Sequence, residues 1–344
     1  MGLSLQSRLM RKGVALLLAA LATLLLPCFG SAGETAAPPG EYKRAPGPHA
    51  VEALHFTWND ARRRRQAPVK VYLPREAAGP FPVVVVSHGL GGSRETYAYL
   101  GSHWASHGYA AVHLQHPGSD EAVWRGSPQP MQALRQALAK PENALNRPRD
   151  VGFALDRLAA LNHSEPRFQG RLNLNAVGAA GHSFGAFTVQ ALAGQIFTLP
   201  LGREVTLADR RIRAGVVMSP TAPGKPEHRL RAFSRIRIPL LYLTGTRDHS
   251  PITDTRGEER RLPFDHTTAP DQYLVILKDG DHFTFVGPGR PGGGGERESR
   301  RWDLVRMTTT AFWDAYLKGD PQALAWLSQG CAQTLGTDGT LEKK

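Results

Sequence analysis

Gly181-His182-Ser183-Phe184-Gly185 is the stretch of sequence that decides the fold of this chain. An apolar run at residues 176–180 precedes it and suits a buried strand, and residues 186–193 can continue as a helix. A serine between two glycines at a strand-to-helix turn is the pattern of a nucleophile elbow. Gly181 and Gly185 let strand and helix approach closely, while the turn strains Ser183 and projects its hydroxyl above the sheet. The stretch therefore predicts an α/β fold with Ser183 as the nucleophile.

A second glycine-rich turn, residues 88–92, directly follows the β-branched run of residues 82–87. Such a run is typical of a strand buried on both faces of a parallel sheet. The turn lets backbone N–H groups face a cavity, as half of an oxyanion hole must. We expect the N–H groups of Leu90 and Phe184 to form that hole. A plain strand-to-helix connection is the alternative for this turn.

The two partners of Ser183 are expected in loops that follow later strands. Asp248 comes after the apolar run of residues 238–244, and His282 comes after that of residues 272–277. The chain order Ser183, Asp248, His282 is the order of the α/β-hydrolase triad. His282 would accept the hydroxyl proton, and Asp248 would orient the imidazole. Three other carboxylates near these loops are less favourably placed, because they are turn residues or lie farther from a strand: Asp254, Asp279 and Asp281.

The first 32 residues have the three regions of a secretory signal peptide. Three basic residues precede the apolar run of residues 14–26, and small residues follow up to Ala32. The apolar run is short for a membrane span. We therefore expect cleavage near Ala32 and export to the periplasm or the medium, with an uncleaved anchor as the alternative. Removal lowers the net charge from +12 to +9 and leaves Cys331 as the single thiol, which excludes an intramolecular disulfide.

One α/β-hydrolase domain is expected over residues 51–330, because the remaining length and the 41% hydrophobic content suit a single large core. Residues 33–50 are rich in Pro, Gly and Ala and are expected to form a disordered leader. Residues 331–344 are expected to form a frayed tail. A helix is predicted from Ser93, as its N-cap, to His107.

Two clusters of polar residues have more than one interpretation. Residues 62–65 are four consecutive arginines; nucleic-acid binding is conceivable, but the strand-like flanks favour a solvated hairpin tip. His116 and Asp120 lie just beyond a strand, and a structural or pocket-rim role is favoured over a metal site. The connection from Gly118 to Pro141 is expected to shape the pocket.

The segments around both turns resemble those of the platelet-activating-factor acetylhydrolase family, and equally those of bacterial proteins described as predicted dienelactone hydrolases. The resemblance spans about residues 51–320 and rests on residues 87–92, 116–120, 147–150, 181–186, 245–251 and 281–283. It implies an α/β-hydrolase fold with a mostly parallel, eight-stranded sheet flanked by helices, and hydrolysis of carboxylic esters. True dienelactone hydrolases carry a cysteine at the elbow, where this chain has Ser183, so dienelactone is not the expected substrate.

We expect a secreted serine hydrolase that cleaves short-chain or lipid-like esters through an acyl-enzyme intermediate. The side chains of Leu90 and Phe184 are expected to wall the acyl site. This chemistry needs no cofactor and no metal. Two alternatives remain open: a peptidase or amidase on the same fold, and a noncatalytic protein that binds polyanions.

The excess of Arg and Lys also suits peripheral contact with an anionic membrane surface, whereas no specific nucleic-acid partner is expected. The sequence does not predict the natural ester or the oligomeric state.

Overall fold

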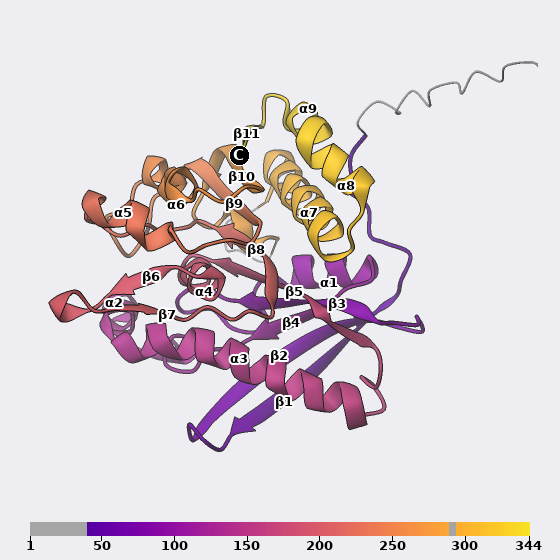
Figure 1. The fold of residues 1–344 in the computed structure, drawn as a ribbon, viewed down its shortest axis with the longest axis horizontal. Coiled ribbons are helices and arrows are strands. Elements are labelled where there is room, and N and C mark those ends of the chain that lie inside the picture. Colours follow the sequence, from indigo (N-terminus) through magenta and orange to yellow (C-terminus); the bar gives the residue numbers. More distant parts are fainter. Residues whose placement is uncertain (1–39, 289–293) are drawn as a thin grey trace, which may run out of the picture. The chain divides into compact units, whose positions relative to one another are not determined.

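The computed structural model describes residues 40–288 and 294–344. The expected signal peptide and residues 33–39 of the expected leader lie outside the described residues. The described chain forms one α/β unit built on a nine-stranded sheet, with the strand order β1-β2-β4-β3-β5-β8-β9-β10-β11 (Figure 1). The sheet strands are β1 (Val51–Asp60), β2 (Arg65–Pro74), β3 (Phe81–Ser87), β4 (Ala110–Leu114), β5 (Leu172–His182), β8 (Ile212–Met218), β9 (Leu240–Arg247), β10 (Gln272–Asp281) and β11 (Gly339–Lys343).

Six central strands, from β4 to β10 in the sheet order, pair in parallel. The strands β1 and β2 form an antiparallel hairpin at one edge, and β11 pairs antiparallel with β10 at the other. Because parallel strands end at the same edge of a sheet, the loops after β3, β5, β9 and β10 meet there. This topology brings the two glycine-rich turns, Asp248 and His282 to one edge.

Helices cover both faces of the sheet (Figure 1). One apolar core joins the sheet to α3 (Pro141–Ser164), α4 (Phe184–Ala193), α5 (Pro226–Phe233) and α6 (Leu262–His266). The other core joins it to α1 (Ala98–Ser106), α7 (Glu296–Leu317), the π-helical turn η5 (Trp326–Gly330) and α9 (Cys331–Leu335). The aromatic side chains of α7 lie in this second core, where Trp104 and Trp313 meet edge to face. None of the helices in the described ranges is long and apolar enough to cross a membrane.

The shorter elements connect these layers. They are η1 (Glu121–Val123), α2 (Pro130–Ala139), β6 (Ile196–Thr198), η2 (Pro200–Gly202), β7 (Glu204–Thr206), η3 (Gly257–Arg261), η4 (Thr284–Val286) and α8 (Pro321–Ala325). The strands β6 and β7 pair with each other as a separate two-stranded ribbon.

The expected frayed tail at residues 331–344 is wrong. Cys331 is fully buried at the start of α9, and residues Gly339–Lys343 form β11, the ninth strand of the sheet. The resemblance implied eight strands, and the tail supplies the additional one by pairing with β10. Burial raises the pKa of the Cys331 thiol to about 12, so this cysteine is a packed core residue.

The expected disordered leader is also wrong for its described part, residues 40–50. Tyr42 and Lys43 both bond to the buried carboxylate of Asp314 on α7, at 2.9 and 2.6 Å. Arg44 donates to Asp303 on the same helix at 2.7 Å. These ion pairs join the segment to a helix about 260 residues later in the chain, and no local sequence pattern shows them.

Two local predictions need adjustment. Helix α1 begins at Ala98 instead of Ser93, because residues 93–96 form a turn and Tyr97 adopts the left-handed conformation at φ 65°. The four arginines do sit at a hairpin tip. However, Arg63 and Arg65 are not solvated, because both donate to the buried carboxylate of Asp150 at 2.7 and 2.9 Å.

Candidate active site

Ser183 occupies a strained turn between β5 and α4. Its backbone has φ 56° and ψ −115°, a conformation that residues with a side chain rarely adopt. The turn is possible because Gly181 and Gly185 have no Cβ: one on Gly181 would collide with the carbonyl of Gly185, and one on Gly185 with that of Ser87. The strand β3 therefore packs directly on the start of α4. Ser183 is half-buried, with its hydroxyl at the carboxyl edge of the sheet.

The three residues expected to act together do meet at this edge. His282 Nε2 lies 3.0 Å from Ser183 Oγ, and His282 Nδ1 lies 2.8 Å from Asp248 Oδ1. Because a carboxylate only accepts, Nδ1 carries a proton, which leaves Nε2 to accept from the serine hydroxyl. We call Ser183, His282 and Asp248 the cavity triad.

Asp248 is fully buried and held in its ionised form. Burial alone would raise the pKa of its carboxyl, but the hydrogen bond from His282 and the charge of Arg260 lower it below the ordinary value. Thr244 also donates to Asp248 Oδ2 at 2.9 Å. Arg260, itself buried, lies 3.4 Å from Asp248 Oδ1 and donates to the Asp248 carbonyl. The charged carboxylate can therefore both orient His282 and stabilise its protonated form.

The other carboxylates of these loops have different partners. Asp279 forms an ion pair with Arg247 at 2.9 Å. Asp281 accepts from the N–H of Phe283 and from Thr284, as a turn residue does. Asp254 is exposed on the loop after β9. Asp248 is the carboxylate that contacts His282.

The two amides expected to form an oxyanion hole flank Ser183. Phe184 is the first residue of α4, and Leu90 lines the same cavity as Ser183. Within the described chain neither N–H donates to another group, so both can donate to a ligand. The turn that carries Leu90 is held from below by Arg147, which is fully buried and donates to the carbonyl of His88 at 2.5 Å.

A cavity of about 560 Å³ opens in front of Ser183 and His282. Its apolar wall comes from Leu90, Met131, Leu134, Pro251, Ile252, Phe283 and Val286. The described residues that line it include no Asp, Glu, Lys or Arg side chain. Leu90 was expected in this wall. Phe184 was also expected there, wrongly: its side chain is buried and its ring lies 4.2 Å from the guanidinium carbon of Arg147.

The connection from Gly118 to Pro141 shapes the cavity in two ways. Its helix α2 contributes Met131 and Leu134 to the apolar wall. Trp124 donates from its indole nitrogen to the carbonyl of Gly91 at 2.7 Å, and thereby braces the glycine-rich turn. The sequence predicted a role for the segment but not these residues. The amphipathic spacing of residues 130–139 could have predicted a helix with an apolar face.

A second Ser–His–Asp set lies beneath the glycine-rich turn. His116 Nε2 is 2.9 Å from Ser87 Oγ, and His116 Nδ1 is 2.9 Å from Asp150 Oδ2. We call Ser87, His116 and Asp150 the buried triad, because the three residues are at most 2% exposed. Burial and the charge of Arg147 lower the pKa of His116 to about 4, so its ring is neutral at neutral pH. His116 therefore has the structural role favoured by the sequence.

Asp120, the other residue weighed as a metal ligand, accepts from Gln115 at 2.8 Å. No cluster of three or more His, Cys, Asp or Glu side chains suited to a metal occurs in the described ranges.

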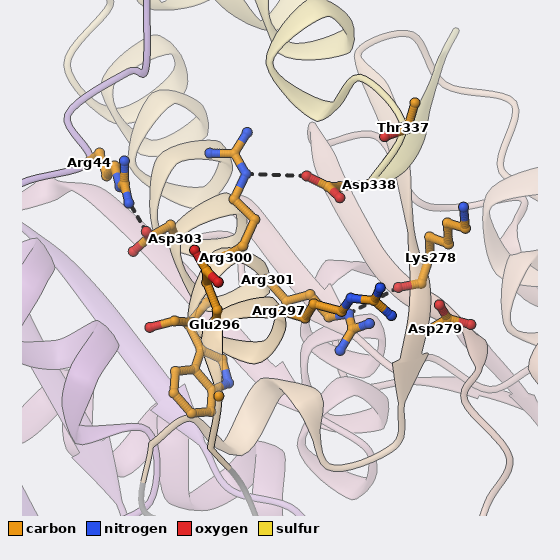
Figure 2. A pocket seen from close by; sticks show the side chains of 13 residues that line it. Arg44, Lys278, Asp279, Glu296, Arg297, Arg300, Arg301, Asp303, Thr337 and Asp338 are labelled. Carbon is orange, nitrogen blue, oxygen red and sulfur yellow. Dashed lines mark hydrogen bonds and ion pairs between the residues drawn. The ribbon is translucent and has the colours of Figure 1, made fainter.

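A larger cavity of about 880 Å³ lies beside the start of α7 (Figure 2). Its walls carry charges of both signs, some of which pair: Arg44 bonds to Asp303, and Arg300 bonds to Asp338. Arg301 donates to the carbonyl of Lys278 at 2.9 Å. The described residues of this wall include none of the cavity triad and no histidine or cysteine. We therefore expect the chemistry to occur in the smaller, apolar cavity.

Comparison with known proteins agrees with this geometry. Residues 59–126, which include the glycine-rich turn and β4, match the family model of platelet-activating factor acetylhydrolase, isoform II. The chain therefore has an α/β-hydrolase fold and is similar to the platelet-activating factor acetylhydrolases. The matched residues end before Ser183, so the elbow and the other two triad residues rest on the structure.

Three relatives extend the similarity. A platelet-activating factor acetylhydrolase of Cavia porcellus is 23% identical over 248 residues, which are 64% of this chain and 52% of the relative. That of Canis lupus familiaris is 24% identical over 207 residues, 52% of this chain and 43% of the relative. That of Bos taurus is 24% identical over 235 residues, 60% of this chain and 48% of the relative. The chain spans about half the length of the curated relatives it matches.

Proposed function

We propose that this protein is a serine hydrolase that cleaves uncharged or lipid-like carboxylic esters with a short acyl group. The observation that carries the proposal is the hydroxyl of Ser183 at 3.0 Å from His282 Nε2, on a strained elbow that opens into an apolar cavity. The similarity to platelet-activating factor acetylhydrolases supports ester hydrolysis as the reaction class.

In the proposed reaction, Ser183 Oγ bonds to the ester carbonyl carbon while its proton passes to His282 Nε2. The carbonyl oxygen becomes an oxyanion, which accepts hydrogen bonds from the N–H groups of Leu90 and Phe184; one such donor typically contributes about 3 kcal/mol. His282 then gives the proton to the leaving alkoxide as the C–O bond breaks. Water hydrolyses the acyl-enzyme by the reverse proton path, and Asp248 stabilises the imidazolium in both halves.

The cavity wall supports an uncharged substrate. A peptide side chain or a charged acyl group would lose its hydration there without a compensating charge, since no Asp, Glu, Lys or Arg side chain of the described chain lines the cavity. The volume of about 560 Å³ lies within the usual range for small-molecule sites. These features favour an ester over a peptide.

The test is a series of p-nitrophenyl esters, from acetate through butyrate and octanoate to palmitate, together with a p-nitroanilide. We expect the highest kcat/KM for the short esters and loss of activity in Ser183→Ala. A maximum at palmitate would contradict the short acyl group. Efficient cleavage of the anilide would favour a peptidase instead.

We also propose export after cleavage near Ala32, supported by the sequence of residues 1–32. N-terminal sequencing of the mature protein should begin at or near Gly33; retention of the first 32 residues would contradict export with cleavage.

Peripheral contact with anionic membranes remains part of the proposal, supported by the mature charge of +9 and by the exposed Met131 and Phe283 at the cavity. Cosedimentation should be stronger with anionic than with neutral vesicles, and equal binding would contradict this contact.

A further inference from the structure

His182, the residue before Ser183, is hydrogen-bonded to the loop of His282 and to Tyr97, which immediately precedes α1. Its Nε2 lies 2.8 Å from the carbonyl oxygen of His282, and its Nδ1 lies 2.9 Å from the hydroxyl of Tyr97. The hydroxyl of Tyr97 in turn accepts from the N–H of Gly89 at 3.3 Å. Both side chains are at most 3% exposed. A continuous chain of hydrogen bonds thus runs from the loop of His282 to the residue before Leu90.

The direction of every bond in this chain follows from the two ends. The carbonyl of His282 can only accept, so His182 Nε2 carries a proton. In a neutral imidazole the other nitrogen accepts, so Tyr97 donates its O–H to Nδ1. Burial and the nearby His282 lower the pKa of His182 to about 3, which keeps the ring neutral at neutral pH. All three hydrogen bonds are then satisfied at once, with Gly89 N–H donating to the tyrosine oxygen.

We propose that Tyr97 and His182 are positioning residues. Together they form a bridge that fixes the loop of His282 relative to the glycine-rich turn of residues 88–92. The inference rests on the proposed function, because it assigns a task to residues that do not react themselves. Tyr97 lines the cavity, but its hydroxyl already donates to His182 and accepts from Gly89. It is therefore not free to protonate a leaving group.

The backbone of Tyr97 supports this role. Tyr97 is held at φ 65°, a left-handed conformation that is unfavourable for a residue with a side chain. Such strain persists where surrounding contacts over-determine the conformation and is concentrated at functional sites. Gly89 also packs tightly on the elbow, since a Cβ there would lie 3.3 Å from His182 Nδ1. In this conformation the tyrosine hydroxyl contacts both Gly89 and His182.

The test is kinetic and uses the full chain. Tyr97→Phe keeps the ring but removes both hydrogen bonds of the hydroxyl, and we expect kcat to fall about ten- to a hundredfold with KM nearly unchanged. His182→Leu should lose at least as much. His182→Gln should recover part of the loss, because its amide can donate to His282 and accept from Tyr97. The double variant Tyr97→Phe/His182→Leu should match His182→Leu alone, since both changes break one bridge.

Tyr242→Phe is the matched control, because Tyr242 is equally buried and loses one hydrogen bond, to Thr267, away from the cavity. It should keep kcat within about twofold of the wild type. The bridge is contradicted if Tyr97→Phe also stays within twofold, or if its loss is only in KM. Reaction of the wild type with a fluorophosphonate distinguishes failure of the bridge from failure of the proposed function. If the wild type is labelled at Ser183 and Tyr97→Phe keeps the wild-type kcat, only the bridge is refuted. If the wild type is not labelled, the proposed function is refuted.

Discussion

The cavity triad and the buried triad have nearly the same hydrogen-bond geometry and different surroundings. Serine-to-histidine and histidine-to-aspartate distances are 3.0 and 2.8 Å in the first and 2.9 and 2.9 Å in the second. Ser183 is half-buried on a strained elbow beside an apolar cavity, whereas Ser87 is 2% exposed at the end of β3. Of the two serines, Ser183 alone lines the apolar cavity, near two amides, those of Leu90 and Phe184, that donate to no other group in the described chain.

The histidines differ as well. His116 lies near the buried cation Arg147, and burial together with that charge holds its pKa at about 4. A base with so low a pKa is a poor acceptor for a serine proton. We therefore interpret the buried triad as a structural network that supports the glycine-rich turn. The same hydrogen bonds thus occur in two surroundings that differ in solvent access and backbone strain, and we propose that these differences make Ser183 the nucleophile and Ser87 a structural residue.

The largest expected difference comes from changing the two aspartates. Asp248→Asn should lower kcat by about 10⁴, the loss measured for the corresponding change in the trypsin triad, and should also lower stability because Arg260 pairs with the same buried carboxylate. Asp150→Asn should lower stability without removing a group of the proposed reaction. It leaves Arg63 and Arg65 without their buried partner, and breaking a buried ion pair typically costs about 3–5 kcal/mol of the free energy of unfolding.

Steady-state kinetics and urea unfolding of both variants, with Asp254→Asn as a control near the wild type, would check this contrast. A large loss of kcat in Asp254→Asn with an active Asp248→Asn would show that the wrong carboxylate has been assigned.

The next largest effect concerns how the free energy of unfolding depends on pH through His116. The unfolded chain takes up a proton on this histidine as the pH falls below about 6.5, whereas the folded ring stays neutral to about pH 4. The unfolded state thus binds more protons in this window, and the free energy of unfolding must fall as the pH drops. We expect His116→Gln to reduce that fall by about 1–3 kcal/mol. Parallel curves of wild type and variant in urea unfolding at several pH values would contradict the assignment.

The smallest effect concerns the acyl wall that the buried triad lacks. Leu134→Ala removes apolar bulk next to Gly91 of the glycine-rich turn, so kcat/KM for p-nitrophenyl octanoate relative to acetate should rise about tenfold, the lower end of the roughly 10–200-fold range of such pocket changes. Leu324→Ala, which alters an exposed leucine on α8, should leave the ratio unchanged. An equal ratio in both variants would show that α2 does not set acyl length.

The sequence predicted the features that depend on local patterns. The elbow of Ser183, the run before the glycine-rich turn and the chain order of Asp248 and His282 are short signals. Parallel pairing then brings them to one edge of the sheet, and the structure shows the three side chains in contact. The same argument placed Leu90 in the cavity wall.

The features that the sequence did not predict depend on contacts between distant residues. Residues 40–44 are held by Asp303 and Asp314, and β11 is a short polar edge strand without clear alternation. The bridge from Tyr97 to His182 spans 85 residues and relies on a left-handed tyrosine. The sequence predicted a solvated tip for the β1–β2 hairpin. This was wrong for two of its arginines because their partner, Asp150, lies on a helix far along the chain.

The most direct test is to map the adduct that an organophosphate forms with the protein, by mass spectrometry of the digested chain. Both triads present a serine hydrogen-bonded to a histidine, so the reagent chooses between them. We predict one adduct per chain, on Ser183, with complete loss of esterase activity and no adduct in Ser183→Ala; Ser87→Ala should be labelled as fast as the wild type. An adduct on Ser87, or full activity in Ser183→Ala, would contradict the account.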